Sequence, residues 1–386
     1  MVARLTAPAV RRLFLLTGAV VLVDTMFFAA LTPLLPEYTE ELGLSKASAG
    51  VLAASYPLGV LLAGIPSGFA AARFGVRPTV LAGLGLMATT TLAFGFGNSI
   101  VLLDVARFAQ GVGSSFAWTG ALAWLIGLAP PGRRGELIGS VMAAAIAGAL
   151  LGPVLGGVAT VVGTEAAFGG VAAITLALAA WAWATPAGSP GERQPARLVL
   201  AALRDRSVLF GAWFVALPAL LFGTLGVLAP LRLDELGLAA VLIGATFLTA
   251  AAFEAVLSPL IGRLSDRRGR RLPLRAGLTG STLVAATIPW LGQRWLLAAF
   301  VVLAGIAFGS FWAPALSQLS DLAEVRGLDH AWGFALVNIA WAPGQALGAA
   351  GGGALAGASA DAVPYVLLAG LCALTLALMR REPVPA

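Results

Sequence analysis

Apolar runs of about 20 residues recur from one end of the chain to the other, and each is long enough for an α-helix to cross ~30 Å of hydrocarbon. Hydrophobic residues make up 59% of the 386 residues and charged residues only 11%, whereas a soluble globular domain carries about 25% charged residues. The runs are also unlike the short alternating strands of a membrane β-barrel. The chain is therefore expected to be an all-α integral membrane protein.

Charges, glycine and proline clusters, and the lengths of the apolar runs divide the sequence into twelve candidate membrane spans. The first follows Arg11 and Arg12 and is too long for the apolar region of a signal peptide, so it is predicted to be a retained helix. The spans are predicted near residues 13–35, 47–71, 79–98, 100–127, 137–161, 167–185, 209–231, 240–264, 273–292, 295–319, 331–356 and 361–379.

The arginines between the spans fall almost entirely on one side of the predicted membrane. Short loops rich in Lys and Arg stay in the cytoplasm, so both termini are expected to be cytoplasmic. Because the net charge of +6 is spread over many loops, it reflects topology rather than nucleic-acid binding. No Asn-x-Ser/Thr acceptor occurs, which favours a multi-pass protein of a bacterial inner membrane. The cytoplasmic set is Arg4, Arg11, Arg12, Arg73, Arg77, Arg133, Arg134, Arg193, Arg197, Arg204, Arg206, the cluster from Arg263 to Arg275, Arg326, Arg380 and Arg381, against only Lys46, Arg232 and Arg294.

This charge asymmetry gives a testable topology. Reporters fused at the C-terminus or near Glu192 are expected to be cytoplasmic, and reporters near Lys46 or Arg294 external. Paired fusions to alkaline phosphatase and to a fluorescent protein measure the side directly. An odd number of crossings between Lys46 and Arg294 would contradict both the topology and the fold.

One long polar segment rich in proline and glycine, residues 185–205, separates six spans from six. We therefore predict an N-terminal six-helix bundle over residues 1–185, a cytoplasmic linker over 186–208 and a C-terminal six-helix bundle over 209–386.

The two halves repeat each other. The tetrapeptide ELGL at residues 41–44 returns 194 residues later, and at the same spacing Gly75 meets Gly269 and Trp118 meets Trp312. A constant register over several spans indicates an internal duplication. Parallel six-helix repeats are a transporter architecture in which the site lies near the bilayer midplane.

Four charged side chains lie well within predicted spans, where a charge costs roughly 2.5 to 3.5 kcal/mol. Asp104 and Arg107 stand one helical turn apart in the fourth span, so they either satisfy each other or take part in proton coupling. Asp24 in the first span and Glu254 in the eighth have no charged partner at i±3 or i±4. They are the leading candidates for binding a proton or an organic cation, Asp24 first and Glu254 second.

The spans also carry polar and aromatic side chains that suit a cavity for an organic molecule. Aromatic faces attract cations and stack on flat apolar ligands, although each such residue could instead pack in the core or face lipid. The predicted substrate contacts are Asp24, Phe27, Tyr56, Gln110, Trp118, Trp312, Asn338 and Trp341, with Phe28, Phe311 and Gln345 in the wider inventory.

The loop after the second span of each half resembles the signature loop of the major facilitator superfamily. The second copy, GRLSDRRGRR, fits GxxxDRxGRR, whereas the first, GFAAARFGVR, has Ala72 where the acid usually stands. The resemblance implies that Asp266 forms a breakable contact with a neighbouring helix N-terminus that latches the cytoplasmic side, although the arginines could only fix topology. The motif positions are Gly68, Arg73, Gly75, Arg77, Gly262, Asp266, Arg267, Gly269 and Arg271.

Two further stretches resemble the same superfamily. RFAQGVGSS at 107–115 is similar to its RxxQGxG pattern, and GALLGPVLGG at 148–157 matches GxxxGPxxGG, which is associated with its proton-coupled antiporters. Glycines at this spacing permit close helix packing by themselves, and the resemblance adds a conformational role with a proline bend. GQALGAAGGG at 344–353 lacks the proline, so close packing alone explains it. The antiporter-motif positions are Gly148, Gly152, Pro153 and Gly156.

The stretch VDTMFFAALTPLLPEY, followed by ARFAQGVGSS, looks like vesicular monoamine and acetylcholine transporters and their bacterial multidrug relatives. In that group an aspartate of the first helix engages a cationic amine, and the matching position here is Asp24. Asn338 stands where those transporters tend to carry an acid, which disfavours a dedicated monoamine carrier.

The expected function is a twelve-helix major facilitator transporter that exports small amphipathic or cationic compounds in exchange for protons by alternating access. The alternative is an exporter of a specific metabolite such as a sugar or an amino acid. An enzyme or a sensor is disfavoured because no HExxH or GxSxG motif and no soluble signalling domain occurs. With one cysteine, Cys372, and one histidine, His330, no disulfide, metal or cofactor is expected. The expected partners are a small molecule, protons and the lipid bilayer, and we expect a monomer that binds no nucleic acid.

Overall fold

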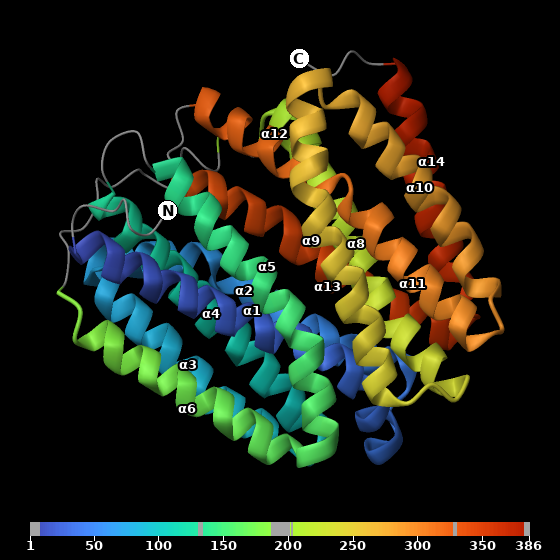
Figure 1. Ribbon diagram of the computed structural model, residues 1–386, viewed down its shortest axis with the longest axis horizontal. Coiled ribbons are helices and arrows are strands. Elements are labelled where there is room, and N and C mark those ends of the chain that lie inside the picture. Colours follow the sequence, from blue (N-terminus) through green and yellow to red (C-terminus); the bar gives the residue numbers. More distant parts are fainter. Residues whose placement is uncertain (1–7, 130–133, 187–200, 202–203, 327–329, 382–386) are drawn as a thin grey trace. The chain divides into compact units, whose positions relative to one another are not determined.

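A computed structural model describes residues 8–129, 134–186, 201, 204–326 and 330–381 (Figure 1). Within these ranges all regular secondary structure is helical. By length and composition, ten segments of the described chain could each cross a membrane. The helices are α1 (Pro8–Leu42), α2 (Lys46–Phe74), α3 (Val76–Gly95), α4 (Ile100–Leu128), α5 (Arg134–Val162), α6 (Thr164–Trp183), α8 (Arg206–Glu235), α9 (Ala240–Arg268), α10 (Arg271–Thr287), the 3₁₀ helix η2 (Ile288–Trp290), α11 (Arg294–Gly309), α12 (Trp312–Val325), α13 (His330–Ala358) and α14 (Ala362–Arg381).

Each predicted span overlaps a helix, but the ninth ends in the 3₁₀ helix η2 and the tenth is broken. Residues 295–319 were expected to form one helix, but α11 ends at Gly309 and α12 begins at Trp312. Pro314 explains the break, because it has no N–H for the Ser310 carbonyl and its ring would clash with that carbonyl. The Ser310 hydroxyl at the end of α11 donates to the Ala307 carbonyl at 2.7 Å. With α11 and α12 counted as one broken segment, the described chain contains twelve helical segments, one for each predicted span, and ten of them meet the length and hydropathy expected of a membrane crossing.

The backbone contacts divide the chain into two compact units. Unit 1 contains Met1–Leu31 and Ser55–Pro195, and unit 2 contains Thr32–Ala54 and Ala196–Ala386. Helices α1 and α2 therefore each begin in one unit and end in the other. The bundle boundaries predicted from sequence stay a prediction, and most of the predicted linker lies outside the described residues.

The internal repeat is visible in the turns that end the helices. Gly43 and Gly237, which are 194 residues apart, both have positive φ, of 61° and 76°. In the same two turns the N–H of Leu44 donates to Thr39 and the N–H of Leu238 to Leu233, both at 3.0 Å. Positive φ is readily available only to glycine, so the duplicated ELGL sequence encodes a duplicated turn.

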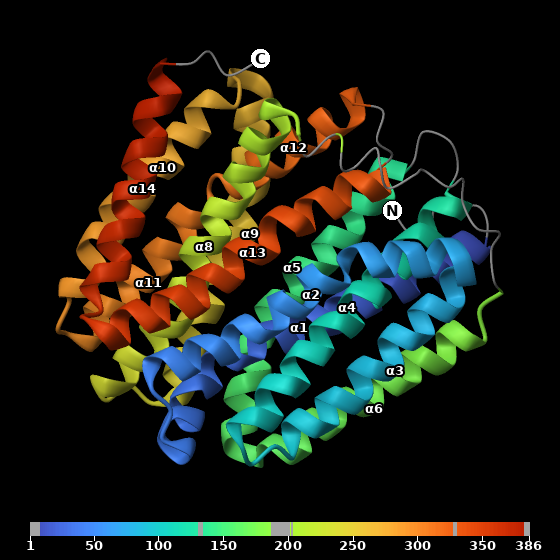
Figure 2. The same cartoon turned by 180° about the vertical axis from the view of Figure 1, so that it is seen from behind.

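In unit 2, α8 and α13 cross each other in close contact (Figure 2). A Cβ added at Gly344 or Gly348 of α13 would overlap a backbone carbonyl of α8, and one at Gly352 would meet Thr224. The Thr224 hydroxyl donates across the contact to the Gly348 carbonyl at 2.9 Å. The glycine-rich stretch at 344–353 therefore serves close helix packing, as predicted.

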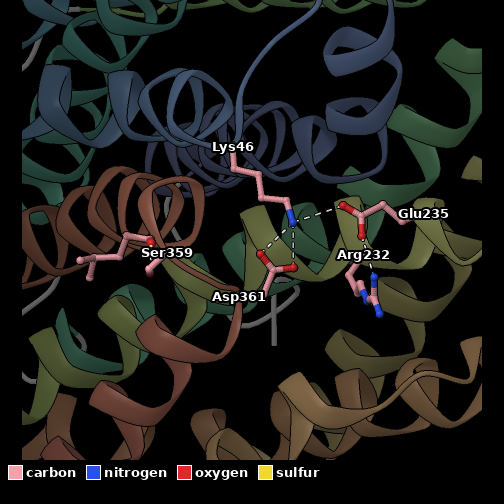
Figure 3. A network of polar contacts seen from close by, with 6 residues as sticks. Lys46, Arg232, Glu235, Ser359 and Asp361 are labelled. Carbon is pink, nitrogen blue, oxygen red and sulfur yellow. Dashed lines mark hydrogen bonds and ion pairs between the residues drawn. The ribbon is translucent and has the colours of Figure 1, made fainter.

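A charged network in unit 2 joins the start of α2, the end of α8 and the turn between α13 and α14 (Figure 3). The Lys46 ammonium lies 2.7 and 2.8 Å from the two Asp361 carboxylate oxygens and 3.2 Å from Glu235. Glu235 also accepts from Arg232 at 2.8 Å. The side chains of Lys46 and Asp361 are only 27% and 25% exposed, so this pair is better shielded than an ordinary surface ion pair.

Replacing Lys46 with methionine is expected to destabilise unit 2. Methionine keeps the apolar stem but leaves Asp361 and Glu235 without their ammonium, at an expected cost of about 1–3 kcal/mol. Thermal unfolding of the purified protein measures the loss. In an Asp361→Asn background the same substitution should cost much less, and an equal cost in both backgrounds would show that the network does not stabilise the fold.

Candidate functional site

Asp24 of α1 is buried in unit 1, with 3% of its surface exposed. Its carboxylate is contacted from two further helices. The Tyr56 hydroxyl of α2 lies 2.8 and 2.9 Å from the two carboxylate oxygens. From α4, the Ser114 hydroxyl and the Trp118 indole N–H donate to Oδ2 at 2.9 and 2.7 Å. The acid at mid-span is thus the centre of a polar group that joins three helices.

The number of protons in this group depends on the charge of Asp24. Its carboxylate and the hydroxyls of Tyr56 and Ser114 form a triangle, because the two hydroxyl oxygens also lie 2.8 Å apart. Each hydroxyl has one proton to donate, so an ionised Asp24 leaves two protons for three contacts. A protonated Asp24 donates to Tyr56, which donates to Ser114, which donates back to Asp24. One added proton therefore completes the ring.

Glycines allow the three helices to approach closely enough for these contacts. A Cβ at Gly111 of α4 would overlap the Tyr56 carbonyl. Similarly, a Cβ at Gly148 of α5 would overlap Leu22 and Thr25 of α1, and one at Gly152 would overlap Met26 and Ala29. The antiporter-motif glycines thus pack on α1 on the stretch that carries Asp24. Pro153 and Gly156 of the same motif are buried.

Arg107 of α4 is buried and fixes α4 to α1. Its guanidinium donates to the Phe27 and Phe28 carbonyls at 3.4 and 3.2 Å and to Gln110 at 3.2 Å. It also lies 5.1 Å from the centre of the Tyr56 ring. A positive charge is therefore placed beside the residue that contacts Asp24, in a cation–π geometry.

The remaining candidates in unit 1 lie in different environments. Phe27 packs edge-on against Phe94 and Phe168, with ring centres 5.6 and 5.0 Å away, so it belongs to an aromatic core. The ring of Phe28 is half-buried and lies 4.9 Å from that of Tyr56.

Two polar candidates of α4 make contacts of their own. Gln110 is buried and donates to Thr91 at 3.0 Å. Asp104 is half-buried and accepts from Ser55 at 3.5 Å.

In unit 2, Glu254 of α9 is half-buried and lies against Gly309, the last residue of α11. Within the described part of the chain its carboxylate makes no hydrogen bond or ion pair. Trp312, Asn338 and Trp341, also of this unit, are half-buried.

In each of the two loops that resemble the superfamily signature, a glycine with positive φ makes the turn after the helix. Gly75 and Gly269, equivalent in the repeat, have φ of 93° and 80° and form the sharp turns after α2 and α9. Arg77 lies 5.4 Å from the Trp183 ring. The side chain of Asp266, the predicted latch, lies outside the described residues. The other motif positions, Gly68, Arg73, Gly262, Arg267 and Arg271, lie in or next to these helix ends.

Ser114 was not singled out from the sequence, although a signal was present. It lies seven residues after Arg107 and four before Trp118, a spacing that places all three on one face of a helix. A serine on the same face as a buried arginine and a predicted ligand residue is a reasonable site candidate.

The repeat offers an internal comparison for this polar group. At positions 194 residues later, Asp24 is matched by Pro218, Tyr56 by Ala250, and Ser114 by Phe308. The packing is nevertheless kept, because Gly305 meets Ala250 as Gly111 meets Tyr56. The second half therefore keeps the helix contacts and lacks the polar side chains of this group.

The long apolar helices, with buried charged groups among them, are those of a multi-pass membrane protein. The sequence model of the Major Facilitator Superfamily matches residues 17–329 and again 216–386. The chain belongs to this superfamily and is a secondary transporter of small molecules.

Solved structures of the superfamily share the fold over almost the whole chain. A bacterial homologue of the human lysosomal transporter Spinster superposes with a TM-score of 0.75, at 16% identity, over 97% of this chain and 96% of that chain. The xylose transporter XylE from E. coli gives a TM-score of 0.76 at 15% identity, over 98% of each chain. These likenesses confirm the predicted all-α, twelve-helix fold.

Curated relatives match over shorter stretches. MFS-type transporter ppzB of Metarhizium rileyi is 37% identical over 79 residues, 20% of this chain and 16% of its own length. Tetracycline resistance protein, class C, of Escherichia coli is 34% identical over 128 residues, 33% of this chain and 31% of its own. Probable vesicular acetylcholine transporter-B of Danio rerio is 36% identical over 124 residues, 30% of this chain and 25% of its own. The chain thus spans less than a third of the length of each of these relatives.

Proposed function

We propose that this transporter is a proton-coupled antiporter that exports small amphipathic or cationic organic compounds by alternating access. The observation that carries the proposal is the ring formed by Asp24, Tyr56 and Ser114. The ring lies in a membrane-spanning region, excludes almost all of the Asp24 surface from solvent and is completed by one added proton. A carboxyl group in such a place is suited to binding a proton at one stage of a cycle and releasing it at another.

Two further observations support the exporter part of the proposal. The antiporter-motif glycines Gly148 and Gly152 pack directly on the Asp24 helix, so a change in their contact would alter the proton site. Among the relatives, one is named for tetracycline resistance and one for vesicular acetylcholine transport. Proton entry supplies a driving force, because one charge moving through 100 mV releases about 2.3 kcal/mol.

Ligand-triggered proton release tests this function. The purified full-length protein is placed in a weakly buffered solution with a pH-sensitive dye and mixed with organic cations, neutral amphipathic compounds, sugars and amino acids. We expect organic cations to release protons, with several unrelated compounds competing for the same response. A response to a single sugar or amino acid would favour the specific-metabolite exporter, and no release with any compound would overturn proton antiport.

A further inference from the structure

Helices α10 and α14 of unit 2 lie side by side and leave a groove between them (Figure 1 and Figure 2). The groove has a volume of about 180 Å³. Its walls are Thr279, Thr282 and Leu283 of α10 and Ala373, Leu376 and Ala377 of α14. The Leu283 side chain is 63% exposed, so the groove opens outward and not into the helix bundle.

The chemistry of the groove is apolar. The Thr279 and Thr282 hydroxyls donate to carbonyls of their own helix, both at 2.8 Å, and the other lining side chains are aliphatic. Because α14 is long and apolar enough to cross a membrane, an outward-facing groove on it is surrounded by lipid. The volume is about six times the ~30 Å³ that one water molecule takes in the liquid. This is room for part of an acyl chain and not for a whole lipid.

Arginines gather at one end of this groove. The two helices are antiparallel, so the start of α10 and the end of α14 lie on the same side of the membrane. On α10, Arg275 stands four residues before Thr279, and on α14, Arg380 and Arg381 stand three and four residues after Ala377. At ~1.5 Å per residue, these arginines are only about one helical turn beyond the groove.

The described part of the chain leaves the charge of Arg275 without a partner. The Arg275 Nε is buried and makes no hydrogen bond there, and the guanidinium forms no ion pair with a described residue. Arg270, just before α10, is instead paired with Asp321 of α12. A buried donor without a partner costs free energy, so an anion that accepts from Arg275 would be bound favourably.

The first half of the repeat is built differently at the corresponding place. Arg77 is the equivalent of Arg271 there, and its guanidinium lies 5.4 Å from the ring of Trp183, the last residue of α6. Like α6, α14 has 20 residues, but it ends in two arginines. The second half therefore collects positive charge where the first half places an aromatic ring against an arginine.

We propose that the groove between α10 and α14 binds one acyl chain of an anionic glycerophospholipid, such as phosphatidylglycerol, and that Arg275 and the arginines at the end of α14 bind its phosphate. The positive charge favours an anionic headgroup over a neutral one. The apolar groove favours a lipid over a free phosphate, because only the lipid buries apolar surface there. The site does not depend on which compound the transporter exports.

The test measures binding of dioleoyl phosphatidylglycerol and dioleoyl phosphatidylcholine to the delipidated full-length protein by native mass spectrometry. The wild type should prefer phosphatidylglycerol. Arg275→Gln should weaken phosphatidylglycerol binding about 5-fold, the effect of one basic residue near a membrane surface, and leave phosphatidylcholine binding unchanged. Arg275→Lys keeps the charge and should bind nearly as the wild type does. Ala377→Leu fills the groove and should weaken binding of both lipids.

Two variants elsewhere on unit 2 are matched controls. Arg263→Gln removes an exposed arginine of α9, and Ala299→Leu enlarges an exposed alanine of α11. Neither residue lines the groove, so both variants should bind phosphatidylglycerol as the wild type does. Thermal unfolding without added lipid verifies that each variant is folded, and Ala377→Leu decides the question if Arg275→Gln does not fold.

Other results would overturn the lipid site. Equal binding of the two lipids by the wild type would do so, as would unchanged phosphatidylglycerol binding in Arg275→Gln and Ala377→Leu. Full competition by glycerophosphoglycerol, the same headgroup without acyl chains, would show an anion site that makes no use of the groove. A smaller molar mass of Ala377→Leu than of the wild type in light scattering would show that the groove holds a second copy of the chain instead.

Discussion

Proton-driven export is expected to fall to the background level when Asp24 is replaced with asparagine. The amide keeps the size of the acid and can donate to Tyr56 while accepting from Ser114 and Trp118, so it imitates a permanently protonated carboxyl group. Such a site cannot release its proton, and the cycle loses its coupling. The measurement is uptake into everted vesicles with an imposed pH gradient, at matched expression.

Exchange of neutral ligands across the same vesicles is the control, because it requires the conformational change but no proton transfer. It should survive in Asp24→Asn. If Asp24→Asn retains full proton-driven transport of a cation, the buried acid is structural, and the central mechanistic proposal is wrong.

The second large effect is expected at the contact between α5 and α1. Replacing Gly152 with leucine would insert a side chain where even a Cβ meets Ala29 and the backbone of Met26. Overpacking of this kind costs about 1–3 kcal/mol, and here it would displace the helix that carries Asp24. We expect transport to be strongly reduced while the protein is still inserted into the membrane.

Gly157 offers a matched control in the same motif. No atom lies within 4 Å of a Cβ built at Gly157, so Gly157→Leu should transport normally. Protein abundance and thermal unfolding of both variants show whether the loss reflects misfolding. Normal transport by Gly152→Leu would remove the functional role assigned to this contact.

The sequence alone was sufficient for the number and approximate positions of the spans, the internal repeat and the membrane class, because these depend on local hydropathy and on spacing along the chain. It was not sufficient for contacts between helices. Nearly every face of these helices is apolar, so periodicity does not identify the face that packs inward. Phe27 and Phe28 illustrate the problem: they are neighbours, yet one is in an aromatic core and the other is half-buried.

Long-range partners were equally inaccessible. Lys46 was recognised only as an exception to the arginine asymmetry, although its partner Asp361 lies 315 residues away in the chain. The break between α11 and α12 was missed because its cause, Pro314, stands four residues after the carbonyl that it affects. Both features depend on residues that hydropathy treats as ordinary parts of a loop or span.

The glycine contact between α8 and α13 has a mechanical consequence. Where two backbones touch, neither helix can slide or roll past the other without a clash, so the two helices are expected to move as one rigid body. The Lys46 ammonium ties the two helices together at one end of the pair, through Glu235 at the end of α8 and Asp361 just after α13. Through Lys46, residues 32–54 are therefore attached to this helix pair, whereas the rest of α1 and α2 belongs to the other unit. Within α1 and α2 themselves, bending is easiest close to Pro33 and Pro57, because each proline removes a hydrogen bond from its helix.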